Sequence, residues 1–321
     1  MSRAGEALRV VAVVGLVVGL LAGAALAAEP ACPPVAVAPT PGQIDGALRQ
    51  ARDQGALWTI EKDGRRSWLY GTIHVGSLSI SVPGPTVVQA LRAADTIAIE
   101  IDLTDASTVK TITAPVEPAV PIPAALLDRV KEQARRACVA WEAVSKLPPM
   151  LLAATLTVLD GRWVQLDTAY APELIFIGMA RSTGKRLRAL ESAAAQRAFF
   201  VSERPERQIE VLDAAVTALE QDRVRRPLTT LARAWSSGDL ATLAAYEQWC
   251  ECVASPEDRA ELERLIVGRN PALASAIDQL HREGQRVFAA VGILHMVGDQ
   301  GLPALLERLG YTVTRVRSDA R

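Results

Sequence analysis

The sequence has few residues of the types that most often mark a functional site, with only three histidines and four cysteines among 321 residues. Lysine and arginine (35) nearly balance aspartate and glutamate (36), so the formal net charge is −1. Without a basic excess, the chain offers no electrostatic footprint for nucleic acid or for an anionic membrane. No serine or cysteine stands in a pattern with histidine that indicates a nucleophile. The chain is nevertheless long enough to bury a full core, as one large domain or two fused halves.

The cysteines do not indicate a zinc site, because Cys250 and Cys252 have no second cysteine pair and no nearby histidine to complete one. As disulfides, Cys32, Cys138, Cys250 and Cys252 allow three pairings, and the sequence does not choose between them. Because the spacing Cys250-Glu251-Cys252 is tight for a bridge between its ends, we expect long-range pairs to Cys32 and Cys138.

The first residues predict a secretory signal peptide over residues 1–27. Arg3 and Arg9 give it a basic start, residues 10–21 are apolar, and Ala25-Leu26-Ala27 is a small-residue cleavage site. The mature protein would then lie in the periplasm or outside the cell. The alternative is an uncleaved anchor, because the apolar stretch 10–28 is long enough to be considered. Only that retained segment would contact a membrane.

The remainder is predicted to be a tether followed by one domain. Residues 28–42 are rich in proline and alanine, which is typical of a tether, and the domain follows over residues 43–321. From about residue 124 to 286 the apolar spacing is mainly helical. This stretch predicts a long helical insertion within the domain.

Two of the three histidines lie in the same short motif at opposite ends of the chain. The motifs are Gly71-Thr72-Ile73-His74 and Gly292-Ile293-Leu294-His295, and each follows an apolar run that predicts a buried strand. Open sheets place their sites just beyond such strands, and imidazole is a common metal ligand. We therefore expect His74 and His295 to share one centre; two unrelated core or surface histidines are the alternative.

Each motif is followed by a loop, a helical stretch and another strand. The helices are expected at 86–94 and 303–309, and the strands at 96–101 and 311–316. Strand–loop–helix–strand units are typical of βαβ crossovers. The sequence thus predicts an α/β fold, with a mixed β-sheet built from two diverged βαβ halves and the helical insertion between them.

Glu100 is the third candidate for this centre. In the strand that contains it, alternation places Glu100 on the face opposite to Ile97, Ile99 and Ile101. A carboxylate in an apolar strand is costly to bury unless it is paired or bound to metal. Two histidines and one carboxylate with open positions form a hydrolytic or non-haem metal pattern. The alternative is an edge strand from which Glu100 points into water.

Several segments, in order along most of the mature chain, resemble the signatures of the TraB/GumN family, which includes PrgY-type pheromone-inhibitor proteins and the Tiki proteases. The two terminal signatures are the most specific. The segments are Trp68–Gly76, Ala98-Ile99-Glu100, Leu190-Glu191 with Gln196, Arg269-Asn270, Val291–Gly298, Gly301-Leu302 and Leu309–Val313. The chain departs from the family at Ala171-Pro172-Glu173, where the family frequently has Gly-x-Asp.

The resemblance implies a metal-dependent hydrolase with His74, His295 and Glu100 at its centre, and the Tiki members imply peptidase chemistry with manganese or cobalt. Zinc is the third candidate ion. The resemblance also implies a fold similar to the erythromycin-esterase-like and ChaN-like proteins. We therefore expect hydrolysis of an amide or ester bond in a peptide or protein. The alternatives are a non-catalytic peptide binder, an accessory protein of envelope polysaccharide assembly, or haem or iron handling by analogy with ChaN-like folds.

Three further residues have expected roles. Arg269 is expected to stabilise an oxyanion; the alternatives are a clamp on a substrate carboxylate, a partner of Glu100 or Glu191, or a surface helix end. Glu191 is a candidate acid or base beside the site, or the cap of the next helix. His281 closes a helix, where a cation suits the helix dipole, so its expected role is structural.

Overall fold

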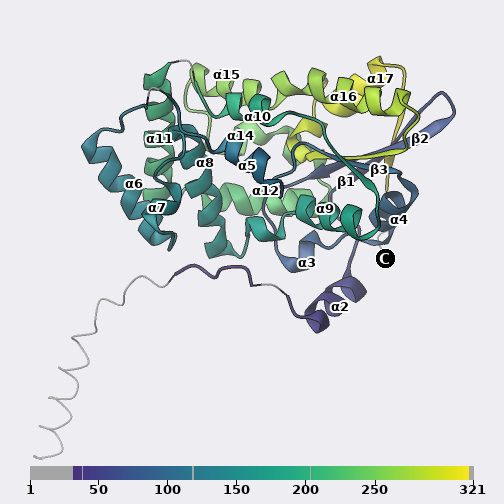
Figure 1. Ribbon diagram of the computed structural model, residues 1–321, viewed down its shortest axis with the longest axis horizontal. Helices are drawn as coiled ribbons and strands as arrows, with labels where there is room; N and C mark the ends of the chain where they lie inside the picture. The colour runs from purple at the N-terminus through teal and green to yellow at the C-terminus, as the bar shows by residue number, and fades with distance from the viewer. Residues whose placement is uncertain (1–31, 38, 118, 203, 318–321) are drawn as a thin grey trace, which may run out of the picture. The chain divides into compact units, whose positions relative to one another are not determined.

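The computed structural model describes residues 32–37, 39–117, 119–202 and 204–317, and those from Pro33 onward form one compact unit (Figure 1). The predicted signal peptide and the first residues of the tether lie outside the described residues. No helix in the described ranges is both long and apolar enough to cross a bilayer.

A six-stranded mixed sheet forms the centre of this unit, in the order β4-β3-β5-β2-β1-β6. Strands β2, β5, β3 and β4 are parallel, whereas β1 runs antiparallel to β2 and β6. Every residue of β5 is buried, as expected of a strand covered on both faces. The strands are β1 (Ala56–Lys62), β2 (Arg65–Thr72), β3 (Thr96–Ile99), β4 (Arg186–Ala189), β5 (Val287–Gly292) and β6 (Thr312–Val316).

Helices cover both faces of the sheet. Figure 1 shows α16 and α17 on one side of it and α4 and α9 on the other. Phe176 of α9 packs against Tyr70 and Phe288, with ring centroids 5.5 and 5.4 Å apart. The helices are α2 (Pro41–Gln50), α3 (Leu78–Ser81), α4 (Pro85–Ala93), α5 (Ala106–Ile112), α6 (Ala124–Arg136), α7 (Trp141–Val144), α8 (Pro149–Asp160), α9 (Pro172–Ser182), α10 (Ala193–Phe199), α11 (Pro205–Glu220), α12 (Arg225–Ser237), α13 (Leu240–Ala244), α14 (Tyr246–Trp249), α15 (Pro256–Leu265), α16 (Asn270–Arg282) and α17 (Leu302–Arg308).

The predicted α/β class and mixed sheet are confirmed, but the strands of the two predicted units are interleaved. β5 lies between β2 and β3, with Thr72 opposite Gly292, while β6 lies at the far edge beyond β1. The sheet is therefore not assembled from two halves side by side. Hydrophobic periodicity predicts that a strand exists and which face it buries, but it does not determine the order of strands.

From α6 to α16 the chain is helical apart from β4 and short 3-10 turns. The helices α6, α8 and α11 bury a second, smaller core of their own. Its fully buried members include Val130, Leu152, Leu212 and Val216. This part of the chain thus combines independent helical packing with one strand that pairs with β3 at the edge of the central sheet.

A disulfide joins Cys250 to Cys252, so the expected long-range pairing of these two cysteines is wrong. Their Cα atoms are 5.1 Å apart, within the usual range for a disulfide. The short spacing is possible because Glu251 adopts a positive φ of 56° and turns the chain back. No cysteine in the described part of the chain is free, so this pair offers no thiolate to a metal.

His281 is a buried structural residue near the end of α16, with 1 % of its surface exposed. Ser67 Oγ accepts a hydrogen bond from Val287 N and lies 3.1 Å from His281 Nδ1, to which it donates. His281 Nε2 donates in turn to Lys62 O at 3.0 Å. The histidine therefore ties α16 to the β1–β2 hairpin.

Replacing His281 by alanine is expected to lower the free energy of unfolding by roughly 2–4 kcal/mol, because it opens a cavity and leaves buried polar atoms unpaired. A guanidinium titration measures the change. Gln279→Ala, at an exposed position on the same helix, is the control and should change stability by less than about 0.5 kcal/mol. Equal effects of the two substitutions would contradict the structural role.

Candidate functional site

The two Gly-x-x-His motifs lie side by side, at the ends of neighbouring parallel strands. β2 and β5 pair with Thr72 opposite Gly292, and His74 and His295 follow at the same edge of the sheet. Glu100 follows the last residue of β3, on the other side of β5. The three carboxyl ends of these strands therefore present the three candidate residues together, which is where open parallel sheets place their sites.

Gly292 marks the position on which these residues converge. A Cβ atom on Gly292 would lie 3.2 Å from Glu100 Oε1, 3.5 Å from His295 Cδ2 and 3.7 Å from His74 Nε2. The absence of a side chain at Gly292 therefore keeps open the space between the two rings and the carboxylate. The main-chain N–H of Gly292 also donates to Glu100 Oε1 at 2.7 Å, which fixes the carboxylate beside that space.

Arg269 connects three of the candidate residues. Its guanidinium forms ion pairs with Glu100 and Glu191, and all three side chains are at most 10 % exposed. Arg269 Nη1 also lies 3.3 Å from His295 Nε2. Among the alternative roles considered for Arg269, the structure shows one: Arg269 is the ion-pair partner of both glutamates.

Helix α10 supports this ion pair from one side. Its N-cap is Ser192, so the alternative reading of Glu191 as the cap is wrong. Instead, Gln196 Nε2 donates to Glu191 Oε2 at 2.7 Å. The Arg269 guanidinium lies over the ring of Phe199, 5.1 Å from its centroid, where a cation–π interaction is favourable. No sequence pattern distinguishes Phe199, because an aromatic residue at the end of a helix is usually a packing residue.

Asn270 determines which nitrogen of His295 carries the proton. Asn270 Nδ2 donates to Gln300 O at 2.7 Å, so its Oδ1 faces His295 Nδ1 at 2.6 Å and accepts from it. His295 Nε2 is left with a lone pair. Burial, helped by the charges of Arg269 and His74, lowers the pKa of His295 to about 4 against the opposing attraction of Glu100. The His295 ring is therefore neutral at neutral pH.

Glu173 is a site residue that the sequence did not identify. Its Oε1 lies 3.0 Å from His74 Nδ1 and accepts a hydrogen bond of 2.5 Å from Thr72 Oγ1. Its Oε2 is buried and has no hydrogen-bond partner among the described residues. Glu173 stands where the resembling family often has aspartate, so a longer carboxylate takes that place. The signal was ambiguous because an acidic residue in the first turn of a helix is also an ordinary partner of the helix dipole.

The charges of the site shift the pKa values of His74 and Glu100 in opposite directions. Dehydration lowers the pKa of His74, but the charge and hydrogen bond of Glu173 and the charge of Glu100 raise it to about 9. Solvent still reaches 67 % of this side chain, so its dehydration is incomplete. Burial raises the pKa of Glu100, but His74, His295, Arg269 and the N–H of Gly292 lower it to about 2. At neutral pH, His74 is protonated and Glu100 is ionised.

Replacing Glu173 by glutamine is expected to lower the pKa of His74 from about 9 toward its ordinary value of 6.5, because the amide keeps the shape of the side chain but not its charge. An NMR titration of the His74 ring measures the shift. Thr72→Val is the matched control, since it removes the other group that binds Glu173 Oε1 and leaves the carboxylate in place. An unchanged titration in Glu173→Gln would mean that Glu173 does not determine the charge of His74.

The histidine nitrogens and the Glu100 carboxylate are donor atoms that suit a divalent ion. In this structure, however, they contact Arg269 and Glu173 in an ion-pair network. Imidazole nitrogens and a carboxylate oxygen are ligands that first-row metals accept, and Asn270 and Glu173 orient the two rings as partners of metal-binding histidines do. Across the described ranges, however, no group of three or more His, Cys, Asp or Glu side chains is arranged to hold an ion. The chemistry of the residues thus fits a metal, and Arg269 is the group that its binding would displace from His295 Nε2.

Comparison with known proteins gives one match. Residues 56–315 match the model of the TraB/PrgY/gumN family, and this range includes every residue that converges around Gly292. No curated protein and no solved structure matches the chain.

Proposed function

The chain belongs to the TraB/PrgY/gumN family, and from this membership and the residues around Gly292 we propose that it is a metal-dependent hydrolase. Its substrate would be an amide or ester bond in a peptide or protein. The observation that carries the proposal is the convergence of His74, His295 and Glu100 on one position. The orientation of both histidine rings by oxygen acceptors supports it further.

The proposed ion is manganese, cobalt or zinc, held by His74 and His295, with Glu100 as a further ligand or as the general base. A divalent ion in such a site polarises a carbonyl group and lowers the pKa of water. His74 is protonated at neutral pH in the metal-free protein, so binding must release its proton. The affinity for the ion is therefore expected to rise with pH.

The remaining residues are proposed to act on the charges around the reacting group. Arg269 would stabilise the developing oxyanion, and Glu191 would hold Arg269 in position as its ion-pair partner. The N–H of Gly292 directs the Glu100 carboxylate into the space over the glycine. The neighbouring charges of His74, His295 and Arg269 help to keep that carboxylate ionised. In this scheme Glu191 is a positioning residue, whereas Glu100 is a catalytic residue.

One observation favours a non-catalytic role as the second candidate. Arg269 already pairs with Glu100 and Glu191 and faces His295 Nε2, so the buried charges are compensated without an ion. In that case the protein would bind a peptide without cleaving it, or serve as an accessory protein in the assembly of envelope polysaccharide.

Metal content separates the two candidates. The protein is purified with manganese, cobalt or zinc present, and bound metal and cleavage of a peptide library are measured on the same samples. Asp102→Asn, at a carboxylate that pairs with Arg181 outside the site, is the control. One ion per chain that is lost in His74→Ala and kept in Asp102→Asn supports the hydrolase. Absence of both bound ion and cleavage under these conditions supports the non-catalytic role.

We also propose that the protein is exported to the periplasm or beyond, on the basis of the sequence of residues 1–27. N-terminal sequencing of the mature protein is expected to give Ala28, and Met1 would indicate a retained anchor. The origin of the sheet as two diverged halves, with an erythromycin-esterase-like or ChaN-like architecture, is likewise a proposal. The repeated Gly-x-x-His motif supports it.

A further inference from the structure

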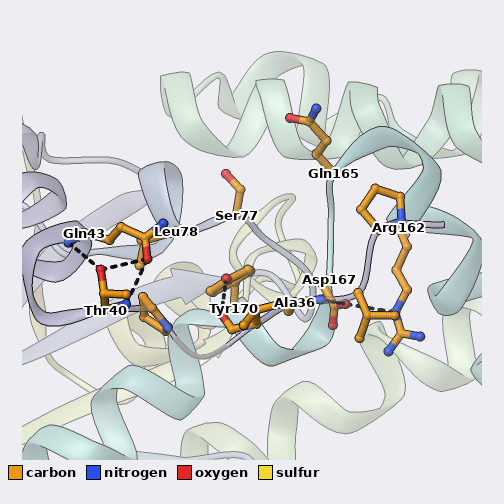
Figure 2. Close-up of a pocket in the computed structure, with 13 residues that line it drawn as sticks. Ala36, Thr40, Gln43, Ser77, Leu78, Arg162, Gln165, Asp167 and Tyr170 are labelled. Atoms are coloured by element: carbon orange, nitrogen blue, oxygen red, sulfur yellow. Dashed lines mark hydrogen bonds and ion pairs between the residues drawn. The ribbon is translucent and has the colours of Figure 1, made fainter.

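Residues 33–37, which we call the arm, lie along the loop that leads into α9. Ala36 N donates to Asp167 Oδ2 at 3.2 Å, and the hydroxyl of Tyr170 donates to Val37 O at 2.9 Å. Figure 2 shows Ala36 beside Asp167 and Tyr170. Both hydrogen bonds are made to the main chain of the arm, so they would be available to a segment with other side chains.

Asp167, which accepts the hydrogen bond from the arm, is held in position by its other hydrogen-bond partners. Asp167 is only 5 % exposed, and it also accepts from Arg162 Nε and from Ala169 N, both at 2.9 Å. The Arg162 guanidinium compensates its charge. A buried, oriented carboxylate of this kind is a strong acceptor for a peptide N–H and carries no free charge to attract an ion.

An open hollow of about 400 Å³ adjoins the arm (Figure 2). This volume lies within the range of protein ligand sites. Its walls are the arm, the start of α2, and loop residues that include Ser77, Gln165 and Tyr170. The two charged residues among those that line it, Arg162 and Asp167, pair with each other. The space therefore suits an uncharged guest.

The segments that border this hollow also border the site around Gly292. Gly76 and Asp167 form an antiparallel bridge, with N···O distances of 3.0 and 2.8 Å. His74 precedes this bridge on one segment, and Glu173 follows it on the other; their side chains are 3.0 Å apart. The two chain segments that position His74 and Glu173 thus also border the hollow.

We propose that the surface under the arm, formed by Asp167 and Tyr170, and the adjoining hollow together form a groove for an extended, uncharged polypeptide that is recognised through its main chain. In this structure the arm occupies the groove. The prolines at 33, 34 and 39 favour the extended backbone that such a groove requires. The inference rests on the proposed function only in taking the guest to be a substrate, because binding in the groove does not require cleavage.

A tethered arm competes strongly with any free peptide. Its effective concentration is on the order of millimolar for a short linker, and a protein whose groove is mostly filled binds a second ligand with reduced apparent affinity. Weakening the arm should therefore improve the binding of a free peptide, whereas weakening the groove should impair it. These opposite signs distinguish a groove from a simple structural contact.

The test uses the full chain and a fluorescein-labelled peptide with the sequence of residues 33–40, measured by fluorescence anisotropy without reference to cleavage. Ala36→Pro removes the N–H that donates to Asp167 and is expected to tighten probe binding at least about tenfold. Adding Tyr170→Phe to that variant removes one hydrogen bond from the groove and should weaken the probe about fivefold. Tyr246→Phe, made instead at a tyrosine that packs on Trp249, is the matched control and should have no effect.

A second probe, N-methylated at the alanine that corresponds to Ala36, should bind the Ala36→Pro variant at least about tenfold more weakly, because it cannot donate to Asp167. Equal binding of the two probes, or no gain of binding in Ala36→Pro, would overturn the proposed groove. Binding as expected by a protein that neither holds metal nor cleaves peptide would sustain the groove and reject the hydrolase.

Discussion

Replacing Glu100 by glutamine is expected to lower metal-dependent peptide turnover by about a hundredfold or more, the usual scale for a general acid–base group. Glutamine keeps the volume of the side chain and an oxygen that accepts from Gly292 N, but it has no charge for a metal or for Arg269. The free energy of unfolding of the metal-free protein should fall by only about 1–2 kcal/mol, because Arg269 keeps its ion pair with Glu191.

Asp102→Asn is the matched control for this experiment, since it makes the same chemical change two residues further along the chain. Asp102 pairs with Arg181, a residue with 56 % of its side chain exposed, and exposed ion pairs contribute little to stability. Its turnover should stay near that of the unchanged protein. Full turnover in Glu100→Gln, with lowered stability, would assign Glu100 a structural role alone.

Removing the guanidinium of Arg269 is expected to have the largest effect on stability of any single substitution at the site. Arg269→Ala leaves Glu100 and Glu191 buried and close together without their shared cation, which should cost about 3–5 kcal/mol. The deficit should shrink as the pH falls, because loss of the Arg269 charge raises the pKa of Glu100 from its low value and protonation then relieves the repulsion between the carboxylates. Chemical denaturation at neutral pH and at about pH 5 measures both effects.

Arg181→Ala provides the comparison, because Arg181 also pairs with a carboxylate but lies mostly in solvent. Its cost should be at most about 1 kcal/mol and nearly independent of pH over the same range. If Arg269→Ala were as stable as Arg181→Ala, the buried ion pairs around Arg269 would be unimportant for the fold.

The sequence predicted the members of the site better than their partners. The sequence identifies His74, His295 and Glu100 because an apolar strand followed by a polar residue can be recognised from the order of residues alone. Their convergence depends on β5 lying between β2 and β3, which no local pattern determines. The role of Arg269 stayed open for the same reason, since its partners at Glu100 and Glu191 come from distant parts of the chain.

Other errors have local physical causes. The disulfide Cys250–Cys252 was not expected because its closure depends on the positive φ of Glu251, a conformation that is uncommon for a non-glycine residue. Asn270 begins α16 and is followed by a proline, which is the usual role of such a residue, but its amide also orients His295. When a residue has two roles, its sequence context predicts only the commoner of them.

The position of β5 also has a consequence for the order of events during folding. β5 is the fifth strand along the chain but the third in the sheet, so β2 and β3 have no partner between them until residues 287–292 have been synthesised. Pairing of strands so distant in sequence is intrinsically slow, and unpaired apolar edges promote association between chains. Chains that end before Val287 should therefore aggregate, and the site should form only at the last stage of folding.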